Sequence, residues 1–263
     1  MSFYLSITIF VVAVSMCVAF AIAWRLQFFS LIDVFWTFTF SFIALAFGLS
    51  QKTSAAQWIF YAMVLVWSLR LGFHILVRLI SHFPNEDARY VELRKKWAGS
   101  FGIKFGAFFA VQGISIIFLS IPLILVAVDY DLEFGVMQRI ALGLWLIGVI
   151  GEALSDFQLR TFKKKSENAG QVCEVGFWRY SRHPNYFCEW LIWCAIGLFA
   201  LNAPFGFVGL VAPATMYYLL NYVSGVPLAE AQSVKSKGSL YIDYQHRVNR
   251  FFPGRPKTRL TLR

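Results

Sequence analysis

The densest group of chemically capable side chains is the segment Gly176-Phe-Trp-Arg-Tyr-Ser-Arg-His-Pro-Asn-Tyr-Phe-Cys-Glu189. Pro184 suits the first position of a helix, where its missing N–H costs nothing. The unpaired backbone N–H groups of that first turn attract anions. The cationic side chains beside them are Arg179, Arg182 and His183. Charge alone does not explain three further polar residues, which are Asn185, Tyr186 and Glu189. We therefore predict a binding site for a phosphorylated ligand here.

Acidic and basic residues precede this segment at helical spacing. Asp156 follows Glu152 by four residues, and Arg160 follows Asp156 by four. Residues four apart share one face of a helix. Carboxylates there are acceptors for ribose hydroxyls, so we expect Asp156 and Arg160 to contact the ligand.

The polar tail after residue 224 carries a second group of candidates. Aromatic and basic residues recur there about every three positions, at Tyr241, Tyr244, Arg247 and Arg250, and Glu230 precedes them. Aromatic rings with guanidinium groups suit adenine and its phosphates. The same pattern is typical of a helix on anionic lipid, so both interpretations stay open. We expect a surface helix near 240–252.

Candidates for proton transfer lie in the first half of the chain. Asp33 and Arg70 fall inside apolar stretches, where a charge is costly unless it is paired, and we expect them to pair. His74 follows Arg70 by four residues. The segment 85–90 mixes acids, a base and an aromatic, and we expect it to form a cap that includes Tyr90.

The apolar composition indicates where these residues must be held. Of the 263 residues, 58% are hydrophobic and 14% are charged, against roughly a quarter charged in soluble domains. Several apolar runs exceed the length that spans a bilayer. We predict an all-α, polytopic membrane protein with seven helices, near 3–24, 29–49, 57–80, 103–128, 137–157, 184–201 and 205–223.

Basic residues fix the expected orientation. They concentrate in the loops after the third and fifth predicted helices and in the tail, while the intervening loops are poor in them. By the positive-inside rule, the N-terminus lies outside and the C-terminus in the cytoplasm. The net charge of +10 is therefore explained by membrane topology and cofactor phosphates, and we expect no nucleic-acid partner.

The chain is expected to form one membrane domain, 1–263, with a substrate side at 1–128 and a cofactor side at 129–263. Its cysteines are Cys17, Cys173, Cys188 and Cys194, without metal-ligand spacing. We predict no disulfide and no metal. A monomer in the bilayer is expected.

Taken together, these segments resemble the steroid 5α-reductase superfamily, in particular its bacterial members grouped as a domain of unknown function. The resemblance covers about Ser30 to Pro253. Residues 176–189 are close to the family pattern G-L-W-R-Y-S-R-H-P-N-Y-F-G-E, with Cys188 at the last glycine. Supporting segments are Ser30–Trp36, Glu86–Tyr90 with Ala88 where proline is common, Asp156–Arg160 and Tyr244–Pro253.

The resemblance implies a seven-helix membrane reductase that binds NADPH in a cytoplasm-facing cavity. Its substrate would be lipophilic, with a carbon–carbon double bond conjugated to a carbonyl. Asn185 and Glu189 would contact the nicotinamide half, and ribose and phosphates would be held by Asp156, Arg160, Arg179, Arg182 and the tail. The animal enzymes place a glutamate and a tyrosine at the carbonyl, but residues 1–128 carry glutamates only in the loop at 86 and 92. Asp33 is the expected substitute, with the hydroxyl or imidazole from Tyr61, His74 or Tyr90.

Two other functions remain open at the level of sequence. Isoprenylcysteine carboxyl methyltransferases share the R-H-P-x-Y motif, which is compatible with an S-adenosylmethionine-dependent enzyme. A non-catalytic lipid- or sterol-binding protein is the third possibility. The lysines 163–165 exceed what a pyrophosphate needs and favour NADP over NAD. The chain lacks Gly-x-Gly-x-x-Gly, so a dinucleotide would bind without a Rossmann domain. The family branch favours a bacterial inner membrane.

Overall fold

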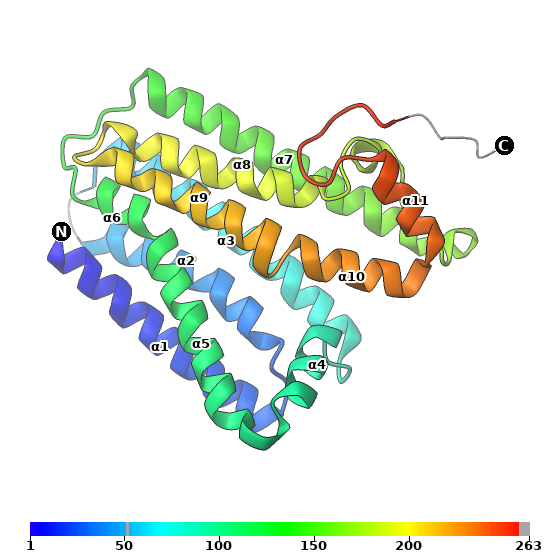
Figure 1. Cartoon of the computed structure of the whole chain (residues 1–263). Helices are drawn as coiled ribbons and strands as arrows, with labels where there is room; N and C mark the ends of the chain where they lie inside the picture. Colours follow the sequence, from blue (N-terminus) through cyan, green and yellow to red (C-terminus); the bar gives the residue numbers. More distant parts are fainter. Residues whose placement is uncertain (51–52, 258–263) are drawn as a thin grey trace. The chain divides into compact units, whose positions relative to one another are not determined.

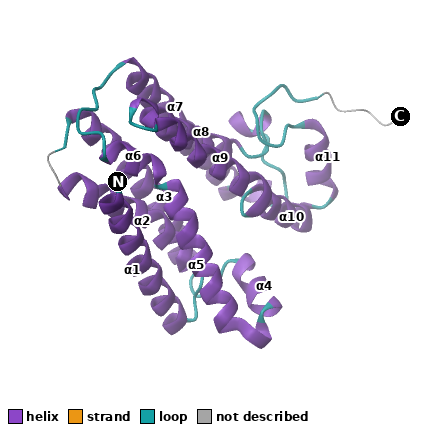
Figure 2. Ribbon diagram, turned by 60° about the vertical axis from the view of Figure 1, so that its left-hand side comes forward, coloured by secondary structure: helices purple, strands orange, loops and turns teal. Residues whose placement is uncertain are grey.

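The computed structural model describes residues 1–50 and 53–257, and within them it contains helices and no strand (Figures 1 and 2). Seven helical segments in this part are long and apolar enough to cross a membrane. They are Ser2–Leu26, Leu31–Ser50, Ala55–His82, Ala98–Leu119, Val136–Lys164, Pro184–Asn202 and Gly206–Lys237. The predicted all-α architecture with seven membrane-spanning helices is confirmed.

The chain divides into two compact units. Unit 1 comprises Met1–Ile140 and Ile196–Ala212, and unit 2 comprises Ala141–Ala195 and Pro213–Arg263. The second segment of unit 1 is the turn between the last two membrane helices with its flanking ends. Two short 3-10 turns, Ala200–Asn202 and Gly206–Leu210, form most of that turn.

Unit 1 is built on three consecutive helices, α1 (Ser2–Leu26), α2 (Leu31–Ser50) and α3 (Ala55–His82). The central helix α2 packs against both neighbours. Small hydroxyl residues lie at these contacts. Ser15 and Thr39 are 2.6 Å apart across α1 and α2, and Ser41 donates to Ser68 of α3 at 2.7 Å. Small residues let membrane helices approach closely while hydrogen bonds join them.

The expected single helix at 103–128 is wrong. It consists of α5 (Phe101–Leu119) and α6 (Ile121–Ala127), separated at Ser120. Pro122 lies in the first turn of α6. Proline has no N–H for the preceding carbonyls and its ring clashes with the earlier turn, so the helix breaks before it. The short helix α4 (Ala88–Lys96) and a 3-10 turn at Ala98–Ser100 precede α5.

Unit 2 holds most of α7 (Val136–Lys164) and α8 (Pro184–Phe199). The helix α7 runs seven residues past its expected end at 157. Its glycines lie against α8, because a Cβ on Gly148 would meet Ile192 at 2.7 Å and one on Gly151 would meet the sulfur of Cys188 at 2.7 Å. Cys188, which stands at the last glycine of the pattern that the sequence resembles, therefore fills the space that Gly151 leaves.

The tail is more helical than expected. The helix α9 (Val211–Tyr218) leads through a π-helical turn at Leu219–Val223 into α10 (Val226–Lys237), and α11 (Ser239–Arg247) follows. Helix α11 ends before the expected residue 252. Figure 1 shows α11 directly after α10. Tyr241 and Tyr244 on α11 are buried, so this helix does not simply lie on a lipid surface.

Candidate functional site

The segment 176–183 of unit 2 is fastened to the end of α7 by its aromatic residues. The indole N–H of Trp178 donates to the carbonyl of Ser155 at 2.9 Å, and the backbone N–H of Phe177 donates to Oε1 of Gln158 at 3.0 Å. Gly176 has a φ of 59°, a conformation that side chains disfavour, and Gln158 fills the space where a Cβ would lie. The predicted motif thus begins at a fixed point on α7.

Ser181 and its neighbours join the same segment to the C-terminal tail. The hydroxyl of Ser181 donates to the carbonyl of Phe251 at 2.8 Å and accepts from the backbone N–H of His183 at 3.1 Å. The backbone N–H of Arg182 donates to the carbonyl of Asn249 at 2.9 Å. These bonds position the first turn of α8, where Pro184 begins the helix as expected.

Arg182 lies at the centre of a largely buried ionic cluster. Its Nε donates to Oε1 of Glu230 at 2.6 Å, and its Nη1 donates to the carbonyls of Gln245 and Val248 at 2.6 and 2.9 Å. Gln245 donates to Oε2 of Glu230 at 3.0 Å. The side chains of Arg182 and Glu230 are only 10% and 15% exposed. Both were predicted to hold the cofactor. In the structure, their hydrogen bonds connect the segment before α8 to α10 and α11.

His183 belongs to this cluster and extends it toward Tyr186. Its Nε2 lies 3.3 Å from Oε1 of Glu230, and its ring stacks on Tyr186 with a centroid distance of 5.5 Å. Burial lowers the pKa of His183 below its ordinary value, and the hydrogen bond to Glu230 only partly opposes that effect. The imidazole is therefore neutral at neutral pH and is not a phosphate-binding cation.

The tail residues predicted to bind adenine and phosphates also have internal partners. The hydroxyl of Tyr244 donates to the carbonyl of Trp178, and its ring is 1% exposed. Tyr241 packs in the same cluster with Val248, and burial raises its pKa to about 12. Arg247 makes two hydrogen bonds to Glu174, at 2.9 and 2.8 Å. Arg250 donates to the carbonyl of Asn221 at 2.6 Å.

Four other predicted ligand contacts lie in the first turn of α8, on α7 and in the 3-10 turn before α8. Nδ2 of Asn185 donates to Oδ1 of Asp156 at 3.2 Å, so the two predicted contacts are brought together. Oδ1 of Asn185 is buried and has no hydrogen-bond partner among the described residues. Arg179 is exposed, at the end of the 3-10 turn Gly176–Arg179. Arg160 is also exposed, one turn beyond Asp156.

This arrangement fits a nicotinamide dinucleotide. A buried carbonyl oxygen without a partner is costly, and the carboxamide N–H₂ of nicotinamide is a donor of the right kind for Asn185. Asp156 offers a carboxylate to ribose hydroxyls, and Arg160 and Arg179 offer guanidinium groups to phosphates. Glu189 lies deeper on α8, is 5% exposed and accepts from the indole of Trp193 at 3.0 Å.

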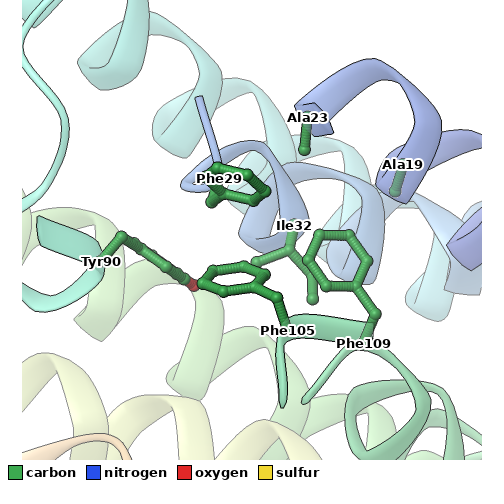
Figure 3. Close-up of a cluster of buried hydrophobic side chains, with 7 residues drawn as sticks. All are labelled: Ala19, Ala23, Phe29, Ile32, Tyr90, Phe105 and Phe109. Atoms are coloured by element: carbon green, nitrogen blue, oxygen red, sulfur yellow. The ribbon is translucent and has the colours of Figure 1, made fainter. Parts of the chain in front are cut away.

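Unit 1 brings together two of the predicted catalytic residues. The phenol of Tyr90 on α4 donates to Oδ1 of Asp33 on α2 at 2.7 Å. Nη2 of Arg89 donates to Oδ2 of the same carboxylate at 2.9 Å. Figure 3 shows Tyr90 reaching into a buried cluster with Phe29, Ile32, Phe105 and Phe109. The result is a phenol and an ion-paired carboxylate at the edge of an aromatic core.

Glu86 fixes the loop that carries Tyr90. Its Oε1 accepts from the backbone N–H groups of Phe29 and Ser30, just before α2 begins. The hydroxyl of Ser30 accepts from the backbone N–H of Asp87 at 3.3 Å. The predicted cap at 85–90 is thus a docked segment whose register sets the distance between Tyr90 and Asp33.

The expected pairing of Asp33 with Arg70 is wrong. Arg89 occupies one oxygen of Asp33 and Tyr90 the other. The loop brings Arg89 to the start of α2, whereas Arg70 lies within α3. His74 lies half-buried on α3, and it is not among the hydrogen-bond partners of Asp33 or Tyr90 in the described part of the chain. Tyr61, the other candidate hydroxyl, is buried near the start of α3.

Sequence reasoning missed Arg89 and Glu86 as site residues. Both lie in the segment Glu86-Asp-Ala-Arg-Tyr90 that the sequence singled out as a cap. The spacing of Arg89 and Tyr90 on a helix start was the available signal. Asp33, the partner of Arg89 and Tyr90, lies 56 and 57 residues away from them in sequence. Local sequence patterns do not encode contacts at that separation.

Comparison with known proteins identifies a family and a relative. The family model described as "Protein of unknown function (DUF1295)" matches residues 19–248. A similar protein is an uncharacterized protein of Schizosaccharomyces pombe (strain 972), which is 27% identical over 239 residues, covering 81% of this chain and 68% of the relative. No solved structure matches the chain.

Proposed function

The chain belongs to the protein family DUF1295, and from that premise we propose that it is an NADPH-dependent membrane reductase. The proposed substrate is lipophilic, steroid-like or another lipid, with a carbon–carbon double bond conjugated to a carbonyl. We propose that its activity is like that of the steroid 5α-reductases. We also propose that the chain crosses a bacterial inner membrane several times, with its basic loops facing the cytoplasm.

The hydrogen bond from Tyr90 to Asp33 is the observation that carries the proposal. A reductase of this type needs a donor at the oxygen on which negative charge develops. Asp33 is ion-paired with Arg89 and acts as an acceptor, so the donor role expected for Asp33 passes to Tyr90. Burial, and next the charge of Asp33, raise the pKa of Tyr90 well above its ordinary value. The phenol therefore keeps its proton and acts as a neutral donor.

The surroundings of this phenol suit a lipophilic substrate. Tyr90 is 3% exposed, and its ring lies 6.3 Å from that of Phe105. In such an apolar environment a hydrogen bond to a developing enolate is stronger than in water. Arg89 and Asp33 orient the phenol. In the proposed reaction the proton of Tyr90 turns from Asp33 to the carbonyl oxygen of the substrate.

Unit 2 supports the choice of cofactor. When bound, NADPH supplies the hydride that reduces the β-carbon of the conjugated double bond. Asn185 would hold the carboxamide through its unpartnered oxygen, and Asp156 would hold Asn185 and a ribose hydroxyl. Arg179 and Arg160 would bind phosphates. S-adenosylmethionine carries no phosphate, so these guanidinium groups favour the dinucleotide.

Cofactor binding by the purified protein in detergent tests the proposal. Calorimetric titration should detect NADPH and fail to detect S-adenosylmethionine. Asn185→Ala should weaken NADPH binding about tenfold or more, because one buried polar contact is worth on the order of 1.4 kcal/mol. Asn202→Ala is the matched control, since Asn202 contacts Gln138 in unit 1. Binding of S-adenosylmethionine alone would refute the reductase assignment.

Reduction itself is tested with a panel of lipophilic enones and deuterium-labelled NADPH. The expected product gains one deuterium at the β-carbon, as measured by mass spectrometry. Saturated lipids serve as the control that should gain no deuterium. If the protein binds NADPH tightly but transfers deuterium to none of the enones, it is a cofactor-binding protein without the proposed catalytic activity.

A further inference from the structure

A separate cavity lies within unit 2, at the ends of α7 and α10 that we predict to face the cytoplasm. Its volume is about 200 Å³, and it is lined by the end of α7, the loop after it and the end of α10. Its polar lining residues are Lys163, Asn168, Gln171, Cys173 and Lys237. Gly170 lies in the loop with a φ of 76°, a turn conformation that glycine permits. None of these residues belongs to the site around Asn185.

The cavity carries two cations without an acid in its lining. Neither Lys163 nor Lys237 has an ion-pair partner among the described residues. Nearby carboxylates are engaged elsewhere. Glu174 binds Arg247 at 2.8 Å, and Glu167 lies 3.7 Å from Lys165. The two lysines therefore repel each other in this cavity with no counter-charge beside them.

Cys173 does not supply that counter-charge. It is buried, and burial raises the pKa of its thiol above the ordinary value. The group is therefore a neutral thiol at neutral pH, and it contributes at most a weak S–H donor. Asn168 and Gln171 add uncharged amide groups. The lining thus offers two ammonium groups and amide donors, which is a donor set for an oxyanion.

The simplest structural explanation covers each lysine separately. Lys163 and Lys237 each lie in the last turn of a helix, where a cation interacts favourably with the helix dipole. The helix-dipole effect would act on each lysine even if the two lysines were far apart. It does not explain why two cations from different helices share one cavity, at a mutual electrostatic cost that an anion would remove.

The size and position of the cavity indicate which anion it takes. A pocket that encloses a whole drug-sized ligand is about 300–1,000 Å³, so 200 Å³ suits one polar group of a larger molecule. Asp156, Arg160 and Lys163 are spaced by four and three residues on α7, hence on one face. At 1.5 Å per residue, Lys163 lies about 10 Å along the helix from Asp156.

We propose that this cavity binds a phosphate monoester, and that its occupant is the phosphate on the adenosine ribose of the cofactor. Lys163 and Lys237 then set the preference for NADPH over NADH. The choice of the cofactor as the source rests on the proposed function. A nicotinamide end at Asn185 and Asp156 and a ribose phosphate at Lys163 give the cofactor one direction along α7.

The test compares adenosine 2′,5′-bisphosphate with adenosine 5′-monophosphate in calorimetric titrations of the detergent-solubilised full chain. Lys163→Ala and Lys237→Ala should each weaken binding of the bisphosphate about tenfold and leave the monophosphate unchanged. The matched control is Lys235→Ala, which removes the same charge from the last turn of α10 outside the cavity. Thermal unfolding of each variant checks that it is folded.

Two further probes separate the sources of the phosphate. Binding to nanodiscs of phosphatidylcholine with and without phosphatidic acid reports a lipid headgroup, and a titration with inorganic phosphate reports a free anion. If Lys163→Ala and Lys237→Ala reduce binding to phosphatidic acid and leave the bisphosphate unaffected, the cofactor assignment is overturned.

Failure of this inference is distinguishable from failure of the proposed function. NADPH binding that is unchanged in both lysine variants, with equal affinity for NADH, overturns the cavity assignment and leaves the reductase intact. Absence of nucleotide binding in the unmodified chain overturns the reductase and the cofactor as source. In that case, unchanged binding of inorganic phosphate and phosphatidic acid in the two variants overturns the phosphate site as well.

Discussion

The phenol of Tyr90 donates a 2.7 Å hydrogen bond to the carboxylate of Asp33, across 57 residues of sequence. The two residues come from α4 and α2, and Arg89 holds the second oxygen of the same carboxylate at 2.9 Å. Ionic and phenolic partners on one carboxylate fix its orientation and that of the phenol. An isolated buried carboxylate would be costly, so this pair is stable because Arg89 completes it.

Replacing this phenol tests its role directly. Tyr90→Phe should lower the rate of enone reduction by about 10²-fold, as loss of one oxyanion donor does in other enzymes. NADPH affinity should stay the same, because Tyr90 is not among the proposed cofactor contacts Asn185, Asp156, Arg160 and Arg179. Single-turnover rates and calorimetric titration provide the two readouts. The control is Tyr61→Phe, which changes a different buried tyrosine, on α3, and should leave the rate unchanged.

Arg182 and Arg179, only three residues apart, should behave differently. Arg182→Ala leaves Glu230 largely buried without its guanidinium partner, which costs about 3 kcal/mol and should lower the unfolding temperature clearly. Arg179→Ala should leave the unfolding temperature unchanged, because Arg179 is exposed and not part of that cluster. NADPH titration should instead show weaker binding to the Arg179 variant. Equal thermal stability of both variants would contradict the internal role of Arg182.

The lowered pKa of His183 predicts a dependence of stability on pH. Burial disfavours the charged imidazole in the folded chain. Between that lowered pKa and about 6.5, the unfolded chain binds a proton that the folded chain does not. Stability should therefore fall as the pH drops below about 6.5 and level off above it. Unfolding temperatures in detergent across this range provide the measurement, and in His183→Gln this part of the slope should disappear.

The contact between α7 and α8 predicts a coupled pair of substitutions. A Cβ at position 151 would meet the sulfur of Cys188 at 2.7 Å, so Gly151→Ala should destabilise the protein by about 1–3 kcal/mol through overpacking. Cys188→Gly removes that sulfur and should restore part of the loss in the double variant. A double-mutant cycle on the unfolding temperature measures the coupling. Additive effects would mean that the two positions do not share this space.

Several features followed from local sequence. Apolar runs long enough to cross a bilayer predicted seven membrane helices, and Pro184 predicted the start of α8. Helical spacing also placed Tyr241 and Tyr244 on one face of a helix, and both are buried on α11. The break at Ser120 and the extension of α7 to Lys164 were missed, because a single proline and a run of polar residues are compatible with either a helix or a loop.

The sequence by itself determined the membrane fold and the segments that carry chemistry, because hydrophobic length and helical period are properties of neighbouring residues. Tertiary structure alone decided the partners. Asp33 pairs with Arg89 and Tyr90 rather than Arg70, and Arg182 turns inward to Glu230 while Arg179 stays exposed. These outcomes depend on how a loop docks and how helices far apart in sequence pack. A buried charge takes the partner that packing brings within reach.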